Sequence, residues 1–222
     1  MPMYTEKVLS VDKLTPDVVR IIISKPDGYS FTPGQATEVS INKEYWATEK
    51  RPFTFTSLPE DDHLEFIIKT YPSHQGVTNQ LLHIKPEDEL IIGDPWGAIT
   101  YQGEGVFIAG GAGITPFISI FRDLNKTNRL GQNKLLFANR RKADIILENE
   151  LHKLLGNKMI NILSEENGVG CLSGFITRDV LREYCCDKNA VFYVCGPPPM
   201  MDLVLRGLSD LHIADQAVVT EI

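Results

Sequence analysis

The sequence predicts two domains, an antiparallel β domain over residues 1–102 and an α/β domain with a parallel sheet over residues 103–222. In the first hundred residues, short β-branched segments are separated by Pro and Gly turns, which is typical of an antiparallel barrel or sandwich. From residue 106 onward, short apolar segments alternate with segments whose apolar residues recur at helical spacing. This alternation predicts a parallel sheet with helices on both faces. The boundary is expected near residues 101–104.

The individual elements follow from these two periodicities. In the first domain we expect one helix, near residues 77–83, and strands at residues 18–23, 36–41, 53–56, 64–68 and 89–92. In the second domain we expect strands at residues 106–109, 135–138, 159–163, 190–195 and 217–220. The helices between them are expected at residues 117–124, 147–155, 177–184 and 201–211.

Composition excludes several classes of protein. The net charge of −7 argues against non-specific nucleic-acid binding. No apolar run approaches the roughly 18 to 20 residues that span a bilayer, and residues 1–6 do not resemble a secretory signal. The four cysteines form no CxxC pair, so neither a metal site nor a disulfide framework is predicted. We expect a reducing, cytoplasmic setting.

A glycine-rich segment, Gly110 to Pro116, follows an apolar strand and precedes a helix. Glycines at such a turn allow the backbone to approach a pyrophosphate closely. Thr115 is a suitable N-cap and Pro116 suits the first helical position, which leaves N–H groups to bind an anion. The alternative is a tight turn that binds no ligand.

A second motif, Cys195-Gly196-Pro197-Pro198, follows the fourth strand of the α/β domain. Ligands of such sheets bind at the carboxyl ends of the strands, so Cys195 could contact a bound ring and the turn from Gly196 could form the floor of its pocket. The alternative is that Cys195 is a small buried filler of the core.

A third motif, Arg51-Pro52-Phe53-Thr54, begins a strand of the first domain. Arg51 can pair bidentately with phosphate, Phe53 offers an aromatic face, and the Thr54 hydroxyl can donate or accept a hydrogen bond. Gly76-Val77-Thr78 opens the helix of this domain and is a further candidate anion site. Taken alone, the Arg51 segment is an ordinary strand.

The order of these motifs, RPFTFTS, GVT, GGAGITP and CGPP, resembles the ferredoxin–NADP reductase superfamily of flavoproteins. The resemblance covers nearly the whole chain. It implies that the first domain is a barrel that binds FAD, and that the second domain binds NAD(P)H.

The resemblance also implies roles for individual residues. At the flavin it places Arg51, Pro52, Phe53, Thr54, Ile68, Lys69, Thr70, Gly76, Val77 and Thr78. At the nicotinamide nucleotide it places Gly111, Gly113, Thr115, Cys195 and Gly196. Thr54 would bond flavin N5 and Cys195 would lie near the hydride-donating carbon.

The sequence departs from the family at two places. Phe53 occupies the position of a flavin-packing Tyr, and the chain does not end in the aromatic residue that covers the flavin in many members. Glu221 resembles a near-terminal Glu that handles protons in some members, although a solvated carboxylate is the alternative.

The choice between NADH and NADPH is left open by opposing signals. Arg140 and Arg141 follow the second strand of the α/β domain and could bind a 2′-phosphate. Glu165 and Glu166 follow the third strand, where they would repel a phosphate and could accept hydrogen bonds from ribose hydroxyls.

We therefore expect a reductase that passes a hydride from NAD(P)H to FAD, then single electrons to a separate acceptor such as flavodoxin or ferredoxin. No four-Cys spacing supplies an iron–sulfur cluster within this chain. The alternatives are a low-turnover flavin-binding protein, an electron-transfer subunit of a larger redox complex, and a flavin-free NAD(P) dehydrogenase.

Overall fold

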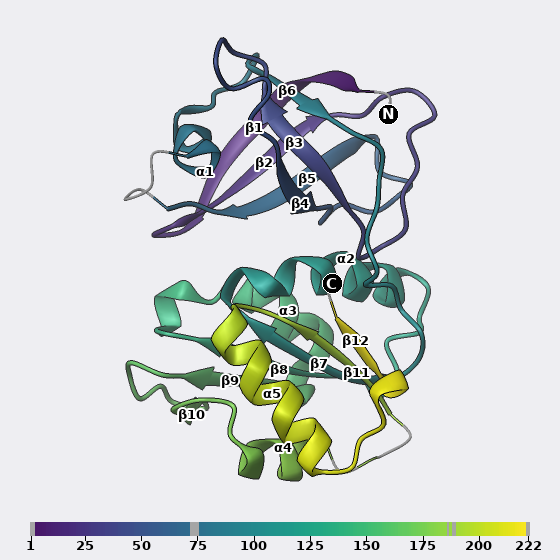
Figure 1. The fold of residues 1–222 in the computed structure, drawn as a ribbon, viewed down its shortest axis with the longest axis vertical. Helices are drawn as coiled ribbons and strands as arrows, with labels where there is room; N and C mark the ends of the chain where they lie inside the picture. Colours follow the sequence, from purple (N-terminus) through teal and green to yellow (C-terminus); the bar gives the residue numbers. More distant parts are fainter. Residues whose placement is uncertain (1–2, 72–75, 186, 188–189, 221–222) are drawn as a thin grey trace.

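The structure is a computed structural model that describes residues 3–71, 76–185, 187 and 190–220. It contains two six-stranded sheets, one in each half of the chain (Figure 1).

The first sheet is antiparallel, with strand order β4-β3-β6-β1-β2-β5. Its strands are β1 (Tyr4–Thr15), β2 (Val18–Ser24), β3 (Ala36–Ile41), β4 (Arg51–Thr54), β5 (His63–Lys69) and β6 (Glu89–Ile92). The two end strands meet where Phe55, just beyond β4, bridges Phe66 of β5. The Thr56 N–H also donates to the Glu65 carbonyl at 2.8 Å. The sheet therefore curls round a core that includes Ile21, Phe55 and Phe66, and the short helix α1 (Val77–Gln80) lies beside it.

Strand β1 is the main element that the sequence pattern misses. It is twelve residues long, but many of its side chains are exposed or half-buried. Its register against β2 shifts between Val8 and Ser10, which indicates a β-bulge or similar irregularity. Because such a shift moves the side chains beyond it to the opposite face, the alternation that would identify a strand is interrupted.

The second sheet is parallel, with strand order β10-β9-β8-β7-β11-β12. Its strands are β7 (Gly105–Gly110), β8 (Lys134–Asn139), β9 (Met159–Leu163), β10 (Leu172–Ser173), β11 (Val191–Cys195) and β12 (Val218–Thr220). Parallel pairing confirms the expected fold class. Only β10 departs from the expected strands, because a two-residue strand leaves no periodicity to read.

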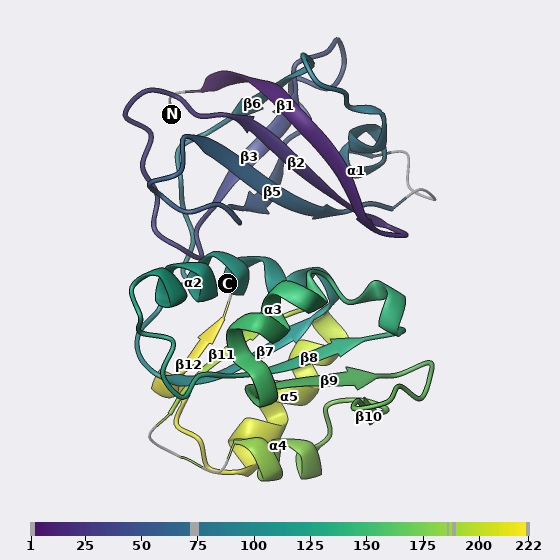
Figure 2. The same cartoon turned by 180° about the vertical axis from the view of Figure 1, so that it is seen from behind.

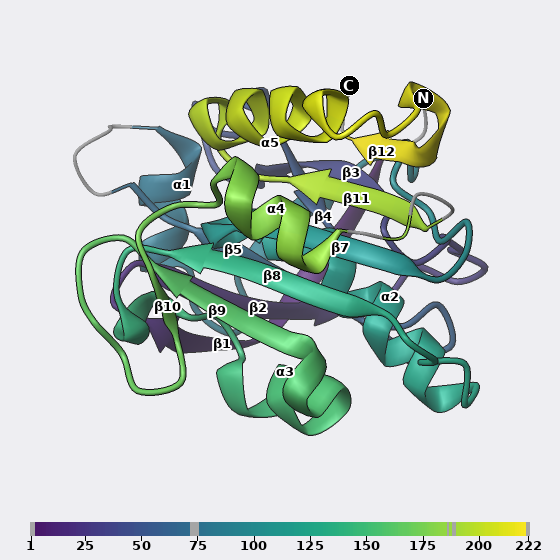
Figure 3. The same cartoon turned by 90° about the horizontal axis from the view of Figure 1, so that it is seen from below.

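Four helices cover the two faces of this sheet: α2 (Thr115–Lys126), α3 (Glu148–Leu155), α4 (Arg178–Tyr184) and α5 (Pro198–Asp210). Helices α2 and α3 pack on the face that carries Phe107 and Phe137. Helices α4 and α5 pack on the opposite face, with Ile108 and Leu136 (Figure 3).

Helix α2 also lies between the two sheets, as opposite views of the molecule show (Figures 1 and 2). The apolar cluster that contains its residues Phe117 and Phe121 also includes Val18, Ile67 and Ile99 from the first half of the chain. The domains are thus joined by a continuous apolar core as well as by the connecting chain.

The connection between the sheets is held by Tyr193 of β11. Its hydroxyl accepts hydrogen bonds from the N–H groups of Gln102 and Gly103, at 2.8 and 3.0 Å, and donates to the Gly103 carbonyl. Burial raises the pKa of this tyrosine above its ordinary value. In the described part of the chain, no helix is both long and apolar enough to cross a bilayer.

Candidate functional site

The order in which the chain adds strands to the parallel sheet reverses at β7. The chain first adds β8, β9 and β10 on one side of β7, and then places β11 and β12 on the other side. In open α/β sheets, a crevice forms at the carboxyl ends of the two strands beside such a switch point, and ligands bind there. The Gly110 turn follows β7 and the Cys195 turn follows β11, so the two motifs of the second domain lie at this switch point.

The glycines of these two turns allow the turns to pack directly against each other. A Cβ at Gly113 would lie 2.3 Å from the carbonyl oxygen of Cys195, and one at Gly110 would lie 2.5 Å from Sδ of Met200. A Cβ at Gly196 would meet Met200 at 2.5 Å and the nitrogen of Gly110 at 3.1 Å. Packing within the protein therefore accounts for glycine at these three positions.

Gly111 has a different role. Its φ is +53°, a left-handed conformation that favours glycine, and a Cβ there would meet no described atom within 4 Å. Of the glycines in this turn, Gly111 is the one with open space for a ligand.

The expectation that Thr115 is an N-cap is wrong. A 3₁₀ turn over Gly111–Ile114 precedes α2, and Thr115 already has helical angles, φ −57° and ψ −43°. Its hydroxyl donates to the Ala112 carbonyl at 3.0 Å, and the residue is buried. A 3₁₀ turn without a side-chain cap thus precedes α2, and it begins about one turn earlier than the Thr-Pro pair indicates.

In the first domain, Arg51 to Thr54 form β4, paired with β3. Thr54 is only 8% exposed, and its hydroxyl has no hydrogen-bond partner among the residues that the structure describes. The Arg51 guanidinium is 48% exposed and contacts only the Lys50 carbonyl, at 2.6 Å, and the Glu49 carboxylate, at 3.6 Å, within that part of the chain. Both groups are available to a ligand.

The other two residues of β4 complete this strand. Pro52 is exposed, and the partly buried Phe53 packs against the core of the first domain. Phe53 therefore has one side in the core and part of its surface accessible.

The end of β5 is fixed by Asp17. The Lys69 ammonium pairs with the Asp17 carboxylate at 2.9 Å. The Thr70 N–H and hydroxyl both donate to the Asp17 carbonyl, at 2.7 and 2.9 Å. Ile68 is buried in the core. These contacts leave the backbone, rather than the side chains, as the part of this segment that could contact a ligand.

Strand β5 also brings the two domains' motifs together. Ile67, directly before Ile68, belongs to the same apolar cluster as Ile114 of the glycine-rich turn, and β5 lies against the Gly111–Ile114 turn. The segment expected at the flavin and the turn expected at the nicotinamide nucleotide are therefore neighbours.

Helix α1 opens at Gly76, which has an extended backbone and where a Cβ would meet no described atom within 4 Å. Val77 is buried in the core of the first domain, while Thr78 is half-buried. Val77 thus anchors the helix, and Gly76 leaves its first turn accessible.

The opposing charges after β8 and β9 lie together. Glu165 pairs with Arg140 at 3.6 Å and with Arg141 at 3.2 Å. The N–H of Lys142 donates to the Glu166 carboxylate at 2.6 Å. Arg140 is 78% exposed. One acidic residue thus offsets both arginines that could bind a 2′-phosphate.

Two further predicted site residues are Cys195, at the end of β11, and Glu221, near the end of the chain. Cys195 is buried at the end of β11, and its carbonyl is the group that contacts Gly113. Glu221 lies outside the described residues.

A buried asparagine was missed by the sequence reasoning. Asn139 ends β8, next to Arg140, and is 8% exposed. Neither its amide oxygen nor its amide nitrogen has a hydrogen-bond partner in the described structure. Buried amides are normally hydrogen-bonded, so Asn139 marks a position where water or a ligand can bind.

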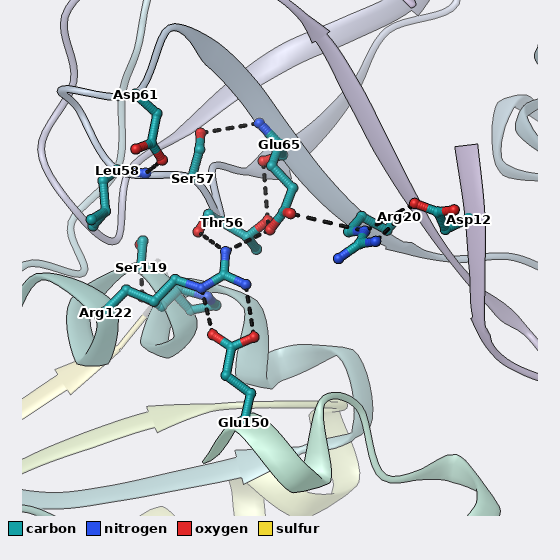
Figure 4. A network of polar contacts seen from close by, with 11 residues as sticks. Asp12, Arg20, Thr56, Ser57, Leu58, Asp61, Glu65, Ser119, Arg122 and Glu150 are labelled. Atoms are coloured by element: carbon teal, nitrogen blue, oxygen red, sulfur yellow. Dashed lines mark hydrogen bonds and ion pairs between the residues drawn. The ribbon is translucent and has the colours of Figure 1, made fainter. Parts of the chain in front are cut away.

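A polar network at the domain interface was also missed (Figure 4). Arg122 of α2 donates to the Thr56 carbonyl at 2.7 Å and to the Glu65 carboxylate at 2.6 Å, both in the first domain. It also pairs bidentately with Glu150 of α3, at 2.6 and 3.0 Å. Burial alone would lower the pKa of Arg122, but the hydrogen bonds and charges of Glu150 and Glu65 raise it.

One sequence signal could have located this interface. The run Phe117-Ile118-Ser119-Ile120-Phe121 is almost entirely apolar round the helix, which is typical of a helix buried on all sides. A polar residue that follows such a run is a candidate for an interdomain contact.

Comparison with known proteins agrees with this architecture. Residues 3–98 match the model of an FAD-binding domain, and residues 107–206 match that of an oxidoreductase NAD-binding domain. The ferredoxin NADP⁺ reductase from Neisseria gonorrhoeae, solved with bound FAD and NADP, shares the fold at a TM-score of 0.87 and 19% identity. The alignment covers 100% of this chain and 98% of that one.

Two curated relatives are oxygenase reductase components. The chain is 32% identical over 218 residues to the reductase component of propane 2-monooxygenase from Mycolicibacterium goodii, covering 90% of this chain and 61% of the relative. It is 24% identical to the ferredoxin–NAD(P)⁺ reductase component of the naphthalene 1,2-dioxygenase system from Pseudomonas putida, covering 96% and 67%. The chain thus spans about 60% of the length of the propane 2-monooxygenase relatives. The chain thus combines an FAD-binding domain and an oxidoreductase NAD-binding domain in this order, and it has the fold of a ferredoxin NADP⁺ reductase.

Proposed function

We propose that this chain is an NAD(P)H-dependent flavoprotein reductase that passes electrons from the nicotinamide, through FAD, to a separate acceptor. The observation that carries the proposal is that β5 packs against the turn at the switch point. This contact places the flavin-binding candidates beside the nicotinamide-binding candidates.

The residues present fit an FAD in the first domain. An exposed guanidinium at Arg51 can bind a pyrophosphate bidentately. The hydroxyl of Thr54, a residue that is 8% exposed, has no described partner and can bond a ring nitrogen. We propose Pro52, Phe53, Ile68, Lys69, Thr70, Gly76, Val77 and Thr78 as the remaining contacts.

The residues of the second domain fit a nicotinamide nucleotide. Gly111 provides open space at the switch point, and Asn139 provides an unsatisfied amide at the same edge of the sheet. We propose that Gly113 and Gly196 shape this site by packing and that Thr115 fixes the turn. We further propose that Cys195 lines the site and that Arg140 lies at its outer end.

When bound, the flavin supplies the chemistry, because it accepts two electrons as a hydride and releases them singly. The protein's own contribution is orientation. Thr54 would hold the ring by a hydrogen bond, the packed glycine turns would set the approach of the nicotinamide, and Glu221 would handle a proton.

We propose a flavodoxin- or ferredoxin-like protein as the acceptor, since the named relatives are reductase components of oxygenase systems. The same names support a second candidate, an electron-transfer subunit of a larger redox complex. We place the domain boundary at residues 102 and 103, between the end of β6 and the start of β7. We also propose a cytoplasmic location, on the cysteine pattern alone.

The proposal is tested by measuring FAD binding and electron transfer separately. The purified protein should show flavin absorption, or bind added FAD, and should reduce a flavodoxin or ferredoxin when NADH or NADPH is supplied. A protein that binds no FAD contradicts the proposal. A protein that binds FAD but reduces none of the acceptors tested indicates the low-turnover alternative.

Removing the Thr54 hydroxyl should slow flavin reduction. Thr54→Val keeps the shape and loses one hydrogen bond, which corresponds to about a tenfold slower step. Thr54→Ser should remain close to the unmodified protein. The limiting rate of flavin reduction by NADH, measured at equal flavin occupancy, checks this, and an unaltered rate in Thr54→Val would remove the hydroxyl from the site.

Removing the Glu165 carboxylate should improve the use of NADPH. Because Glu165 occupies both arginines, we infer that the unmodified protein prefers NADH. Glu165→Gln should free Arg140 and Arg141 for a 2′-phosphate and raise kcat/KM for NADPH about tenfold, the effect of about 1.4 kcal/mol. Asp179→Asn, which removes one exposed charge on α4, is the control. An unchanged ratio of NADPH to NADH activity would show that this cluster does not select the nucleotide.

A further inference from the structure

Helix α2 presents three polar side chains to the first domain. Ser119, Arg122 and Lys126 follow one another at spacings of three and four, so they lie on one face of the helix. Ser119 accepts a hydrogen bond from the N–H of Gly34 at 3.0 Å, and Lys126 pairs with Glu60. Arg122 makes the central contacts of this stripe.

Arg122 differs from its neighbours in being bonded on two sides. Its Nη1 atom faces the first domain and donates to Thr56 and Glu65, while Nε and Nη2 donate to Glu150 of the second domain (Figure 4). The side chain is 20% exposed and that of Glu65 is 7% exposed. The contact is therefore largely shielded from water, which strengthens it relative to a surface ion pair.

The two sides of Arg122 lead to the two candidate nucleotide sites. Thr56 is two residues beyond Thr54, along the segment that continues from β4. Arg122 is seven residues from Thr115, about 10 Å along a rigid helix whose start adjoins the glycine-rich turn. The Arg122 guanidinium thus bonds Thr56 of the segment 51–56, which we call the flavin strand. Arg122 also belongs to the helix that follows the Gly111–Ile114 turn, which we call the nicotinamide turn.

We propose that Arg122 is a positioning residue for hydride transfer, because it fixes the separation and orientation of the flavin strand and the nicotinamide turn. The inference rests on the proposed function. It assigns to Arg122 no contact with either nucleotide. The role requires the planar fork of arginine, since a lysine has a single nitrogen that cannot reach the Thr56 carbonyl and both carboxylates with the same geometry.

The experiment compares Arg122→Lys with a matched control. Arg122→Lys retains the charge opposite Glu65 and so limits the risk of misfolding. Arg129→Lys is the control, because Arg129 follows the same helix and, among the described residues, contacts only its own domain, with Thr127 at 3.1 Å and Asp123 at 3.4 Å. If Arg122→Lys does not fold, Glu150→Gln loosens the same side chain while leaving its contacts to the first domain.

Three quantities are measured for each variant: flavin occupancy, the limiting rate of flavin reduction by NADH, and the long-wavelength charge-transfer absorbance of the flavin–nicotinamide complex. Arg122→Lys should keep its flavin and lose rate by about tenfold to a hundredfold, as expected for a small misplacement of reacting groups. Its charge-transfer absorbance should fall in parallel, and Arg129→Lys should behave as the unmodified protein.

A readout independent of turnover is hydrogen–deuterium exchange without added nicotinamide. Exchange should increase in Arg122→Lys at residues 54–58 and 115–122, and remain unaltered at β8 and β9. Unchanged rate and unchanged charge-transfer absorbance in an Arg122→Lys protein with full flavin occupancy would overturn the inference. Failure of the unmodified protein to be reduced by NADH or NADPH would instead overturn the proposed function.

Discussion

Replacing Gly113 with alanine should abolish flavin reduction by nicotinamide nucleotides and leave FAD bound. The new Cβ would lie 2.3 Å from the carbonyl oxygen and 2.5 Å from the carbonyl carbon of Cys195. Both are backbone atoms, so the two turns must separate to accommodate the methyl group. A displacement of about 1 Å in a positioned reactant costs about a hundredfold in rate, and we expect at least that loss in the reduction of the flavin.

Gly156→Ala is the matched control for this prediction. Gly156 lies in the same domain and has a φ of +57°, so an alanine there strains the backbone, but its Cβ meets no described atom within 4 Å. It therefore controls for lost stability without displacing the glycine turns. Stopped-flow absorbance of the flavin, with thermal unfolding of each variant, separates a displaced turn from an unfolded domain. If folded Gly113→Ala is reduced at the normal rate, the packed turns do not form the nicotinamide site.

Arg51→Ala should lose most of its affinity for FAD. The guanidinium is the exposed cation of β4, and a hydrogen bond to a charged group contributes about 1.5 to 3 kcal/mol. That range corresponds to a dissociation constant for FAD that is about tenfold to hundredfold larger. Titration of the flavin-free protein with FAD, followed by flavin fluorescence, measures the effect directly.

Lys50→Ala is the control, because it removes a neighbouring exposed cation that pairs with Glu38 at 3.7 Å. It should bind FAD nearly as well as the unmodified protein. Equal affinity in Arg51→Ala and Lys50→Ala would remove Arg51 from the pyrophosphate site.

The order of elements was predictable from periodicity, because most strands and helices carry their own apolar pattern. The parallel strands β7, β8 and β9 were located within about two residues of their bounds. Strand β1 was not, since a register irregularity interrupts its pattern and many of its side chains face water. Local periodicity identifies an element only where one face of it is uniformly buried.

The candidate site was predictable in its motifs but less so in its contacts. Gly113 was expected to line the nicotinamide nucleotide site and Gly196 to form the floor of a ring pocket, and the structure adds that both glycines allow two turns to meet. Arg140 and Glu165 gave opposing signals along the sequence, and became one cluster only when β8 and β9 were paired. The apolar run before Arg122 marks it as a candidate interdomain residue, but nothing in the sequence names its partners, because Thr56 and Glu65 lie about sixty residues earlier and Glu150 lies on the next helix.

The most direct test of the account is the anaerobic reduction of bound FAD by NADH in a stopped-flow instrument, repeated with NADH deuterated at the transferred position. If the two nucleotides meet between β5 and the Gly111–Ile114 turn, the flavin should bleach in a single turnover and the deuterated donor should be slower. An FAD-bound protein that neither NADH nor NADPH can bleach would contradict the account.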